Sequence, residues 1–152
     1  MCLSLPRIKS LAASVLLLLF VVAGPASPTS VFDRYGNIRW VDEQARLDNF
    51  AIFLIENPSY IGYIYVWAGR RACNGEAQAR AVRAKNYLVR YRKISENRVV
   101  WQDRGYEENV ETILQPWPRD RAMPAFAWSH VEPKDVTFID RCRHGLPIAK
   151  ER

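Results

Sequence analysis

The chain has few of the residues on which enzyme and metal chemistry usually depends. It contains two histidines, His130 and His144, and three cysteines in 152 residues. Neither histidine has a metal-ligating neighbour three or four positions further along, so the spacing predicts no metal site. The sequence has no strained-turn serine motif and no recognisable acid–base pair. It therefore predicts a protein that is not an enzyme and needs no cofactor.

Long hydrophobic runs are also scarce. Residues 11–23 form an apolar run of about thirteen residues, which is shorter than a membrane-spanning helix requires. Arg7 and Lys9 precede this run, and the small residues Gly24 and Ala26 follow it. The pattern predicts a signal peptide over residues 1–26, with an uncleaved anchor as the alternative. We expect a secreted protein, periplasmic or extracellular, that has no membrane span after cleavage.

Neither charge sign is in large excess. Once Arg7 and Lys9 are removed with the signal, 20 basic and 16 acidic residues remain, a net charge of +4. Such an excess permits attraction to an acidic polymer such as cell-wall glycan. An ordinary soluble surface would carry a similar charge. The charge predicts no specific binding of nucleic acid.

Two cysteines remain after the signal, because Cys2 precedes the apolar run. An oxidising compartment favours a disulfide between Cys73 and Cys142. This bond would close a loop of about 69 residues and stabilise the fold by roughly 4 kcal/mol on the chain-entropy estimate.

The remaining residues centre on one strand, one turn and one helix. Residues 63–67 are β-branched or aromatic and, bounded by glycines, predict a buried strand over residues 62–67. Gly69-Arg70-Arg71 follows as a turn, and residues 75–91 predict a helix. Residues on one face of that helix recur at three- and four-residue steps, namely Ala77, Ala81, Ala84, Leu88 and Tyr91. The opposite face carries Arg83, Lys85, Asn86 and Arg90, and the whole unit predicts a binding surface.

The flanking segments complete an alternating order of strands and helices. A first strand or hairpin falls within residues 31–40, and a helix capped by Asp42 runs to Glu56. Further strands are predicted at residues 98–102, 109–117 and 136–139, with a turn at 103–106 and a loose C-terminus. The order β-α-β-α-β-β predicts an α+β sandwich, with two helices on one face of a small mixed sheet. We assign residues 27–118 to this domain and residues 119–152 to a C-terminal extension.

Several short motifs fall in a distinctive order. Arg80-Ala81 is followed by Leu88, and then come Ile94, Arg98-Val99 and Gly105-Tyr106-Glu107. In this order the chain resembles the OmpA-like C-terminal domain, the periplasmic module of outer-membrane proteins and peptidoglycan-associated lipoproteins. The resemblance covers residues 31–118 and implies an OmpA-like fold in the cell envelope. The chain also resembles secreted bacterial proteins of this type in residues 35–38, 45–50 and 75–81.

The resemblance also suggests a ligand site. Family members that bind peptidoglycan hold its diamino acid with an aspartate after the central strand and an arginine on the helix. Here the turn after the strand reads Ala-Gly-Arg-Arg over residues 68–71 and has no carboxylate. We therefore expect Arg80, Arg70 and Arg71 to converge on a cell-wall or other anionic ligand. The alternatives are an ion pair between Arg80 and Glu76 and a solvated turn at Arg70 and Arg71.

Two functions follow from these observations. The first is a secreted or periplasmic non-enzymatic module that is associated with the envelope or binds an anion. The second is a secreted enzyme or inhibitor whose site lies in residues 119–152, the segment that holds both histidines.

Overall fold

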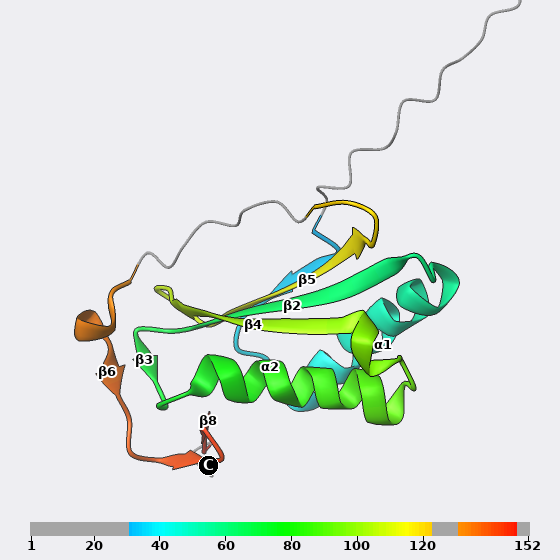
Figure 1. Ribbon diagram of the computed structural model, residues 1–152. Coiled ribbons are helices and arrows are strands. Elements are labelled where there is room, and N and C mark those ends of the chain that lie inside the picture. Colours follow the sequence, from blue (N-terminus) through cyan, green and yellow to red (C-terminus); the bar gives the residue numbers. More distant parts are fainter. Residues whose placement is uncertain (1–30, 123–130, 149–152) are drawn as a thin grey trace, which may run out of the picture.

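The computed structural model describes residues 31–122 and 131–148. It confirms the α+β class, with a small mixed sheet and two long helices that lie on the same face of the sheet (Figure 1). The predicted signal peptide lies outside the described residues. The elements are β1 (Asp33–Tyr35), α1 (Trp40–Glu56), β2 (Tyr60–Ala68), β3 (Arg71–Ala72), α2 (Glu76–Asn86), a π-helical turn (Tyr87–Tyr91), β4 (Val99–Tyr106), β5 (Glu111–Pro118), β6 (Thr137–Phe138), β7 (Cys142–Arg143) and β8 (Leu146–Pro147), with short 3₁₀ turns at Glu96–Arg98 and Pro133–Asp135.

The main sheet has the strand order β1-β5-β2-β4. Strands β2 and β4 are parallel, with Gly62 opposite Val99, whereas β5 runs antiparallel to both β1 and β2. A parallel pair needs a crossover connection, and α2 supplies it between β2 and β4. This connection places α2 against the two strands that it joins.

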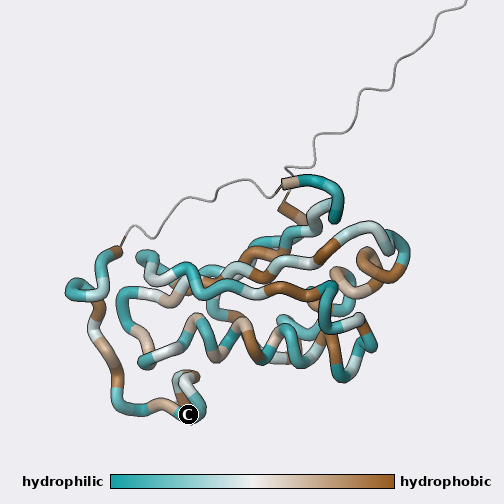
Figure 2. Tube along the Cα trace, viewed as in Figure 1, coloured by the Kyte–Doolittle hydropathy of each residue, from teal (hydrophilic) through white to brown (hydrophobic). Residues whose placement is uncertain are grey.

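The core lies between the sheet and the two helices. Along β2, Ile64, Val66 and Ala68 belong to this core, while Tyr65 and Trp67 belong to a separate cluster with Ile113, as the two-residue period of a strand requires. The hydrophobic stretches of the chain gather in these central strands and in the helices that pack on them (Figure 2). Gly62 has a packing role, because a Cβ there would lie 2.7 Å from Leu54 Cδ1 on α1.

Helix α1 differs from its prediction at the start and gains an unexpected partner at its end. The helix begins at Trp40 after Arg39, so the predicted cap at Asp42 is wrong; Asp42 instead pairs with Arg39 at 2.9 Å within the first turn. At the other end, Arg98 donates hydrogen bonds to the carbonyl oxygens of Leu54 at 2.7 Å and Asn57 at 3.0 Å. The last carbonyl groups of a helix have no hydrogen-bond partner within the helix, and Arg98 supplies one here. Burial lowers the pKa of Arg98.

The segments after the central strand also differ from prediction. The predicted turn at residues 103–106 is wrong, because β4 continues to Tyr106 past a register shift opposite Val66 and Ala68. Part of the predicted 69–71 turn forms β3, which pairs in parallel with β6. In the described part of the C-terminus, β7 and β8 form a hairpin where the sequence predicted loose chain.

Residues 131–148, here called the C-terminal arm, contact the domain at both of its ends. Val131 forms a β-bridge with Tyr106, and the β7–β8 hairpin lies beside the start of α2 (Figure 1). The hairpin turn is His144-Gly145, and both residues have positive φ angles, 51° and 74°, as a two-residue turn of the commonest hairpin class requires. Among the described residues, no helix is long and apolar enough to cross a membrane.

Candidate functional site

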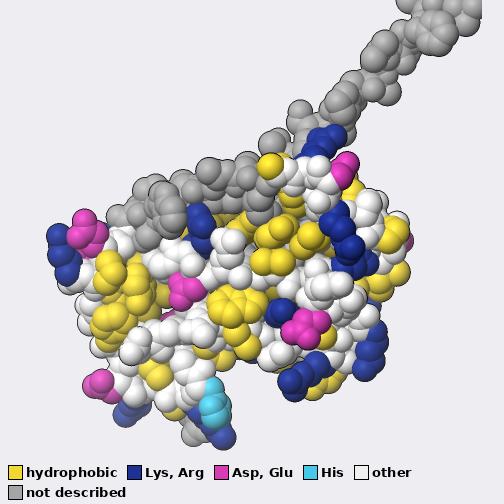
Figure 3. All heavy atoms as spheres, in the orientation of Figure 1, with side chains coloured by type: hydrophobic (Ala, Val, Ile, Leu, Met, Phe, Trp, Pro, Cys, Tyr) yellow, Lys and Arg dark blue, Asp and Glu magenta, His cyan; other side chains and the backbone are white. Residues whose placement is uncertain are grey.

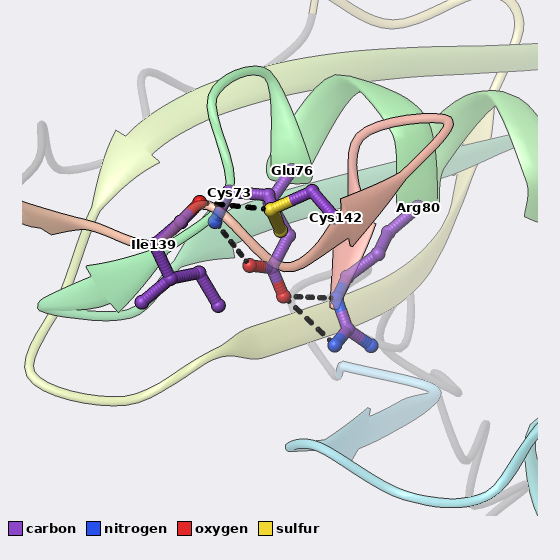
Figure 4. The surroundings of a disulfide bond; sticks show 5 residues. All are labelled: Cys73, Glu76, Arg80, Ile139 and Cys142. Carbon is purple, nitrogen blue, oxygen red and sulfur yellow. Dashed lines mark hydrogen bonds and ion pairs between the residues drawn. A yellow bond between two sulfur atoms is a disulfide. The ribbon is translucent and has the colours of Figure 1, made fainter. Parts of the chain in front are cut away.

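The predicted disulfide between Cys73 and Cys142 is present, with a Cα–Cα distance of 5.9 Å. Cys73 is fully buried in the loop before α2, and Cys142 opens the β7–β8 hairpin. The bond therefore fastens the C-terminal arm to the N-terminal end of α2 (Figure 4).

A buried ion pair continues from the disulfide along α2. Glu76 is 1% exposed, and its Oε2 accepts a hydrogen bond from the Cys73 amide at 3.0 Å. Its Oε1 pairs with the guanidinium of Arg80 at 2.8 Å (Figure 4). Arg80 in turn donates to the side-chain oxygen of Asn37 at 2.8 Å. The disulfide, α2 and the connection between β1 and α1 are thus joined by one chain of polar contacts.

The three arginines predicted to bind a ligand have separate surroundings. Arg80 is 7% exposed and engaged with Glu76, which is the ion pair that the sequence left open as an alternative. Arg70 makes two 2.7 Å hydrogen bonds to Glu108 at the surface, and these bonds are the main cause of a lowered Glu108 pKa. Arg71 lines a hollow of about 430 Å³ together with Arg141 and β6. The three side chains share no partner among the described residues.

A second hollow, of about 490 Å³, lies between α2, the π-helical turn and the hairpin turn of the C-terminal arm. We call it the α2 groove. Its aromatic and basic lining consists of Trp40, Arg83, Tyr87, Arg90, Tyr91 and His144. The volume falls within the range of small-molecule binding sites.

The aromatic side of the α2 groove is an ordered stack. Tyr87 and Tyr91 lie nearly parallel with ring centroids 5.6 Å apart, and Trp40 meets Tyr87 edge-on at 5.6 Å. The Tyr87 hydroxyl donates to Asp48 Oδ1 at 2.7 Å, and this hydrogen bond is the main cause of a raised Tyr87 pKa. Tyr87 is therefore held from two sides, whereas Tyr91 is 74% exposed.

The basic groups of the α2 groove differ in how they are paired. Arg83 lies over the Trp40 ring at 4.4 Å and forms an ion pair with Glu43, a carboxylate that is 2% exposed. Its charge is therefore compensated inside the fold. The side chains of Arg90 and His144 have no hydrogen-bond or ion-pair partner anywhere in residues 31–122 and 131–148. These two groups are the ones that a ligand could engage.

The remaining surface shows no continuous basic patch on the face that Figure 3 presents. Lys and Arg side chains lie there in several separate groups, some of them beside Asp or Glu. This distribution agrees with the moderate charge of the chain. A binding site is therefore better sought in the individual hollows of the surface than in the summed electrostatic field of the protein.

Glu43 also accepts a hydrogen bond from the Tyr35 hydroxyl at 3.3 Å. Burial first, and then the Glu43 charge, raises the pKa of Tyr35 well above its usual value; burial also raises that of Tyr65. Because the pKa of each group is raised in the folded state, its full contribution to the stability of the fold is present below about pH 10, the unfolded tyrosine pKa. This contribution is lost as the pH rises further.

We therefore expect fewer than the seven tyrosines of the chain to ionise before the fold is lost in alkali. An ultraviolet titration followed beside far-ultraviolet circular dichroism measures both events. Tyr35→Phe should leave the number of early-ionising tyrosines unchanged. Reversible ionisation of all seven in the folded protein near pH 10 would contradict the burial of Tyr35 and Tyr65.

Sequence reasoning placed Arg83 and Arg90 on the polar face of the helix but did not find the α2 groove. The wall containing His144 is brought to α2 by contacts between distant parts of the chain. Gly145 packs against Ala79 so closely that a Cβ would lie 2.9 Å from the Ala79 methyl. The available signals were the His144-Gly145 turn pair and the spacing of Tyr87 and Tyr91, which suits neighbours on a helix.

No family model matches the chain, and no curated protein is detectably similar to it in sequence. The OmpA-like resemblance thus remains a prediction that depends on its motif residues. Of these, Arg80 lies in the buried ion pair and Arg98 at the end of α1.

Proposed function

We propose that this protein is an exported, non-enzymatic binding module of the cell envelope with an OmpA-like fold, and that its α2 groove binds an anionic component of the cell wall. The observation that carries the proposal is the pair of basic side chains, Arg90 and His144, at a hollow of about 490 Å³. Arg70, Arg80 and Arg83, in contrast, already have carboxylate partners.

Three features support the envelope part of the proposal. The first is the apolar run over residues 11–23 behind Arg7 and Lys9, which is the pattern of an exported protein. The second is the Cys73–Cys142 disulfide, since such bonds persist in oxidising compartments. The third is the order of the main elements, β1-α1-β2-α2-β4-β5, which agrees with the order of the family that the motifs resemble.

The chemistry of the groove suits an anion better than a cation. An arginine guanidinium binds carboxylate or phosphate with directed, charge-assisted hydrogen bonds, and an imidazole N–H adds a further donor. Two carboxylates that contact residues of this groove, Glu43 and Asp48, are engaged with Arg83, Tyr87 and Arg92. A ligand anion would therefore meet basic groups without first displacing a carboxylate from them.

The alternative, an enzyme or inhibitor with its site in residues 119–152, shares one element with this proposal. His144 and Leu146 of that segment line the α2 groove. A site in the C-terminal extension and a site on α2 would therefore share the α2 groove.

We expect the mature protein to bind purified peptidoglycan sacculi at low ionic strength and to be released by salt. Arg90→Gln should weaken this binding roughly tenfold, the effect of losing one hydrogen bond to a charged group. Arg119→Gln, which removes the same charge from an exposed site after β5, is the matched control. A pull-down at two salt concentrations measures the retained fraction. The absence of retention at low salt, or equal loss in both variants, would overturn the proposal.

A further inference from the structure

We infer that the α2 groove recognises a sugar ring that carries a carboxylate, with the ring on Tyr91 and the carboxylate on Arg90 and His144. This inference depends on the proposed function, because it names the chemical group that the groove would select. It places recognition on the saccharide part of a wall polymer and away from the buried Arg80.

The platform for the ring is Tyr91. Its side chain is 74% exposed, yet one face of the ring is backed by Tyr87 at 5.6 Å with an interplanar angle of 25°. Tyr87 is itself fixed by its hydrogen bond to Asp48 and its edge contact with Trp40. An exposed ring that is supported from behind offers its other face with little loss of conformational freedom on binding.

The face of an aromatic ring is electron-rich. A sugar ring presents a row of axial C–H bonds, with a partial positive charge, on one side. Such a face is complementary to the free side of Tyr91, and the hydroxyl groups at the rim stay in contact with solvent. A purely aliphatic ligand would leave the open, polar parts of this groove unused.

The basic groups stand beside this platform. Arg90 immediately precedes Tyr91, and His144 and Leu146, on the hairpin of the C-terminal arm, line the same groove. A ligand that lies on Tyr91 would therefore present an anionic substituent to basic side chains of this groove. A π-helical turn presents Tyr87 and Tyr91, and the Arg92 amide closes it by donating a hydrogen bond to the Tyr87 carbonyl oxygen at 3.2 Å. Such turns are rare in proteins overall, and those that occur are frequently found at functional sites.

The experiment is an NMR titration of the ¹⁵N-labelled mature protein with three probes, namely glucuronate, glucose and acetate. Glucuronate is expected to shift the amide signals of residues 79–91 and 144–146 and to bind at least several-fold more tightly than either acetate or glucose. Tyr91→Ala should reduce glucuronate affinity roughly fivefold and leave acetate affinity unchanged. Tyr91→Phe keeps the ring and should bind as the wild type does.

The outcomes separate the two proposals. If acetate and glucuronate bind at the α2 groove with equal affinity, the inference about the sugar ring fails while anion binding stands. If no probe perturbs the groove residues, or if Arg90→Gln binds glucuronate as well as the wild type, anion binding at this site fails as well. Because Tyr91 is largely exposed, a variant at this position is expected to fold, and circular dichroism verifies that it does.

Discussion

Glu76→Ala is expected to lower the free energy of unfolding by about 3–5 kcal/mol, the cost of removing one partner from a buried ion pair. The variant would leave the Arg80 guanidinium, 7% exposed, without its counter-charge. It would also leave the Cys73 amide without its acceptor. Urea denaturation of the mature protein measures the change.

Glu108→Ala is the matched control for this prediction. Glu108 forms the same kind of pair with Arg70, but both side chains are exposed, and solvent screens an exposed pair so strongly that its loss should change stability far less. A double variant, Glu76→Leu with Arg80→Met, should recover much of the loss, because it removes both buried charges. An effect of Glu76→Ala no larger than that of Glu108→Ala would show that the pair is not buried as described.

Replacing both Cys73 and Cys142 with alanine is expected to lower the free energy of unfolding by about 4 kcal/mol, the chain-entropy value for a loop of this length. The bond links residues 69 positions apart, so its loss gives the unfolded chain much more freedom. It also releases the hairpin that carries His144. The variant should therefore lose affinity for anions at the α2 groove as well as stability.

Two measurements test the disulfide prediction. Mass spectrometry of the mature protein with and without a dithiol reductant shows whether the cysteines are paired within one chain. Denaturation of the wild type under both conditions should reproduce the difference between the wild type and the double variant. Two free thiols, or a cysteine-linked dimer, would contradict the pairing, and unchanged anion binding in the double variant would show that the hairpin holds its place without the bond.

The parts of the fold that sequence predicted are those with strong local patterns. The stripe of Leu47, Phe50 and Leu54 predicted α1, and all three residues are fully buried. The β-branched and aromatic run after Gly62 predicted β2, which is longer by two residues before the glycine and one after Trp67. Local periodicity specifies such elements because burial of one face drives their formation.

The parts that sequence missed depend on contacts between distant segments. Strand β3 has two residues and exists because Arg71 pairs with Thr137, a contact that no local pattern indicates. Whether Arg80 would face a ligand or Glu76 could likewise not be decided, because both options place the same residues on the same helix face. Burial against the connection between β1 and α1 selects the ion pair, with Asn37 as the second partner.

The α2 groove shows the same limit. Arg90 and Tyr91 are neighbours in sequence, whereas His144 is distant and lies at this groove on a hairpin that the disulfide and the close contact between Gly145 and Ala79 hold against α2. The sequence predicted an anion site at Arg70, Arg71 and Arg80, whereas the proposed anion site lies at Arg90 and His144. Which arginines are compensated by carboxylates is a property of the folded chain.

The most direct test compares sacculus binding by two double variants, each of which replaces two basic side chains with glutamine. Arg90→Gln with His144→Gln removes the basic pair of the α2 groove, and Arg119→Gln with Lys134→Gln removes two exposed basic groups elsewhere. The account predicts that at low ionic strength the first variant loses most of its binding while the second binds as the wild type does. Equal binding by the two variants would contradict it.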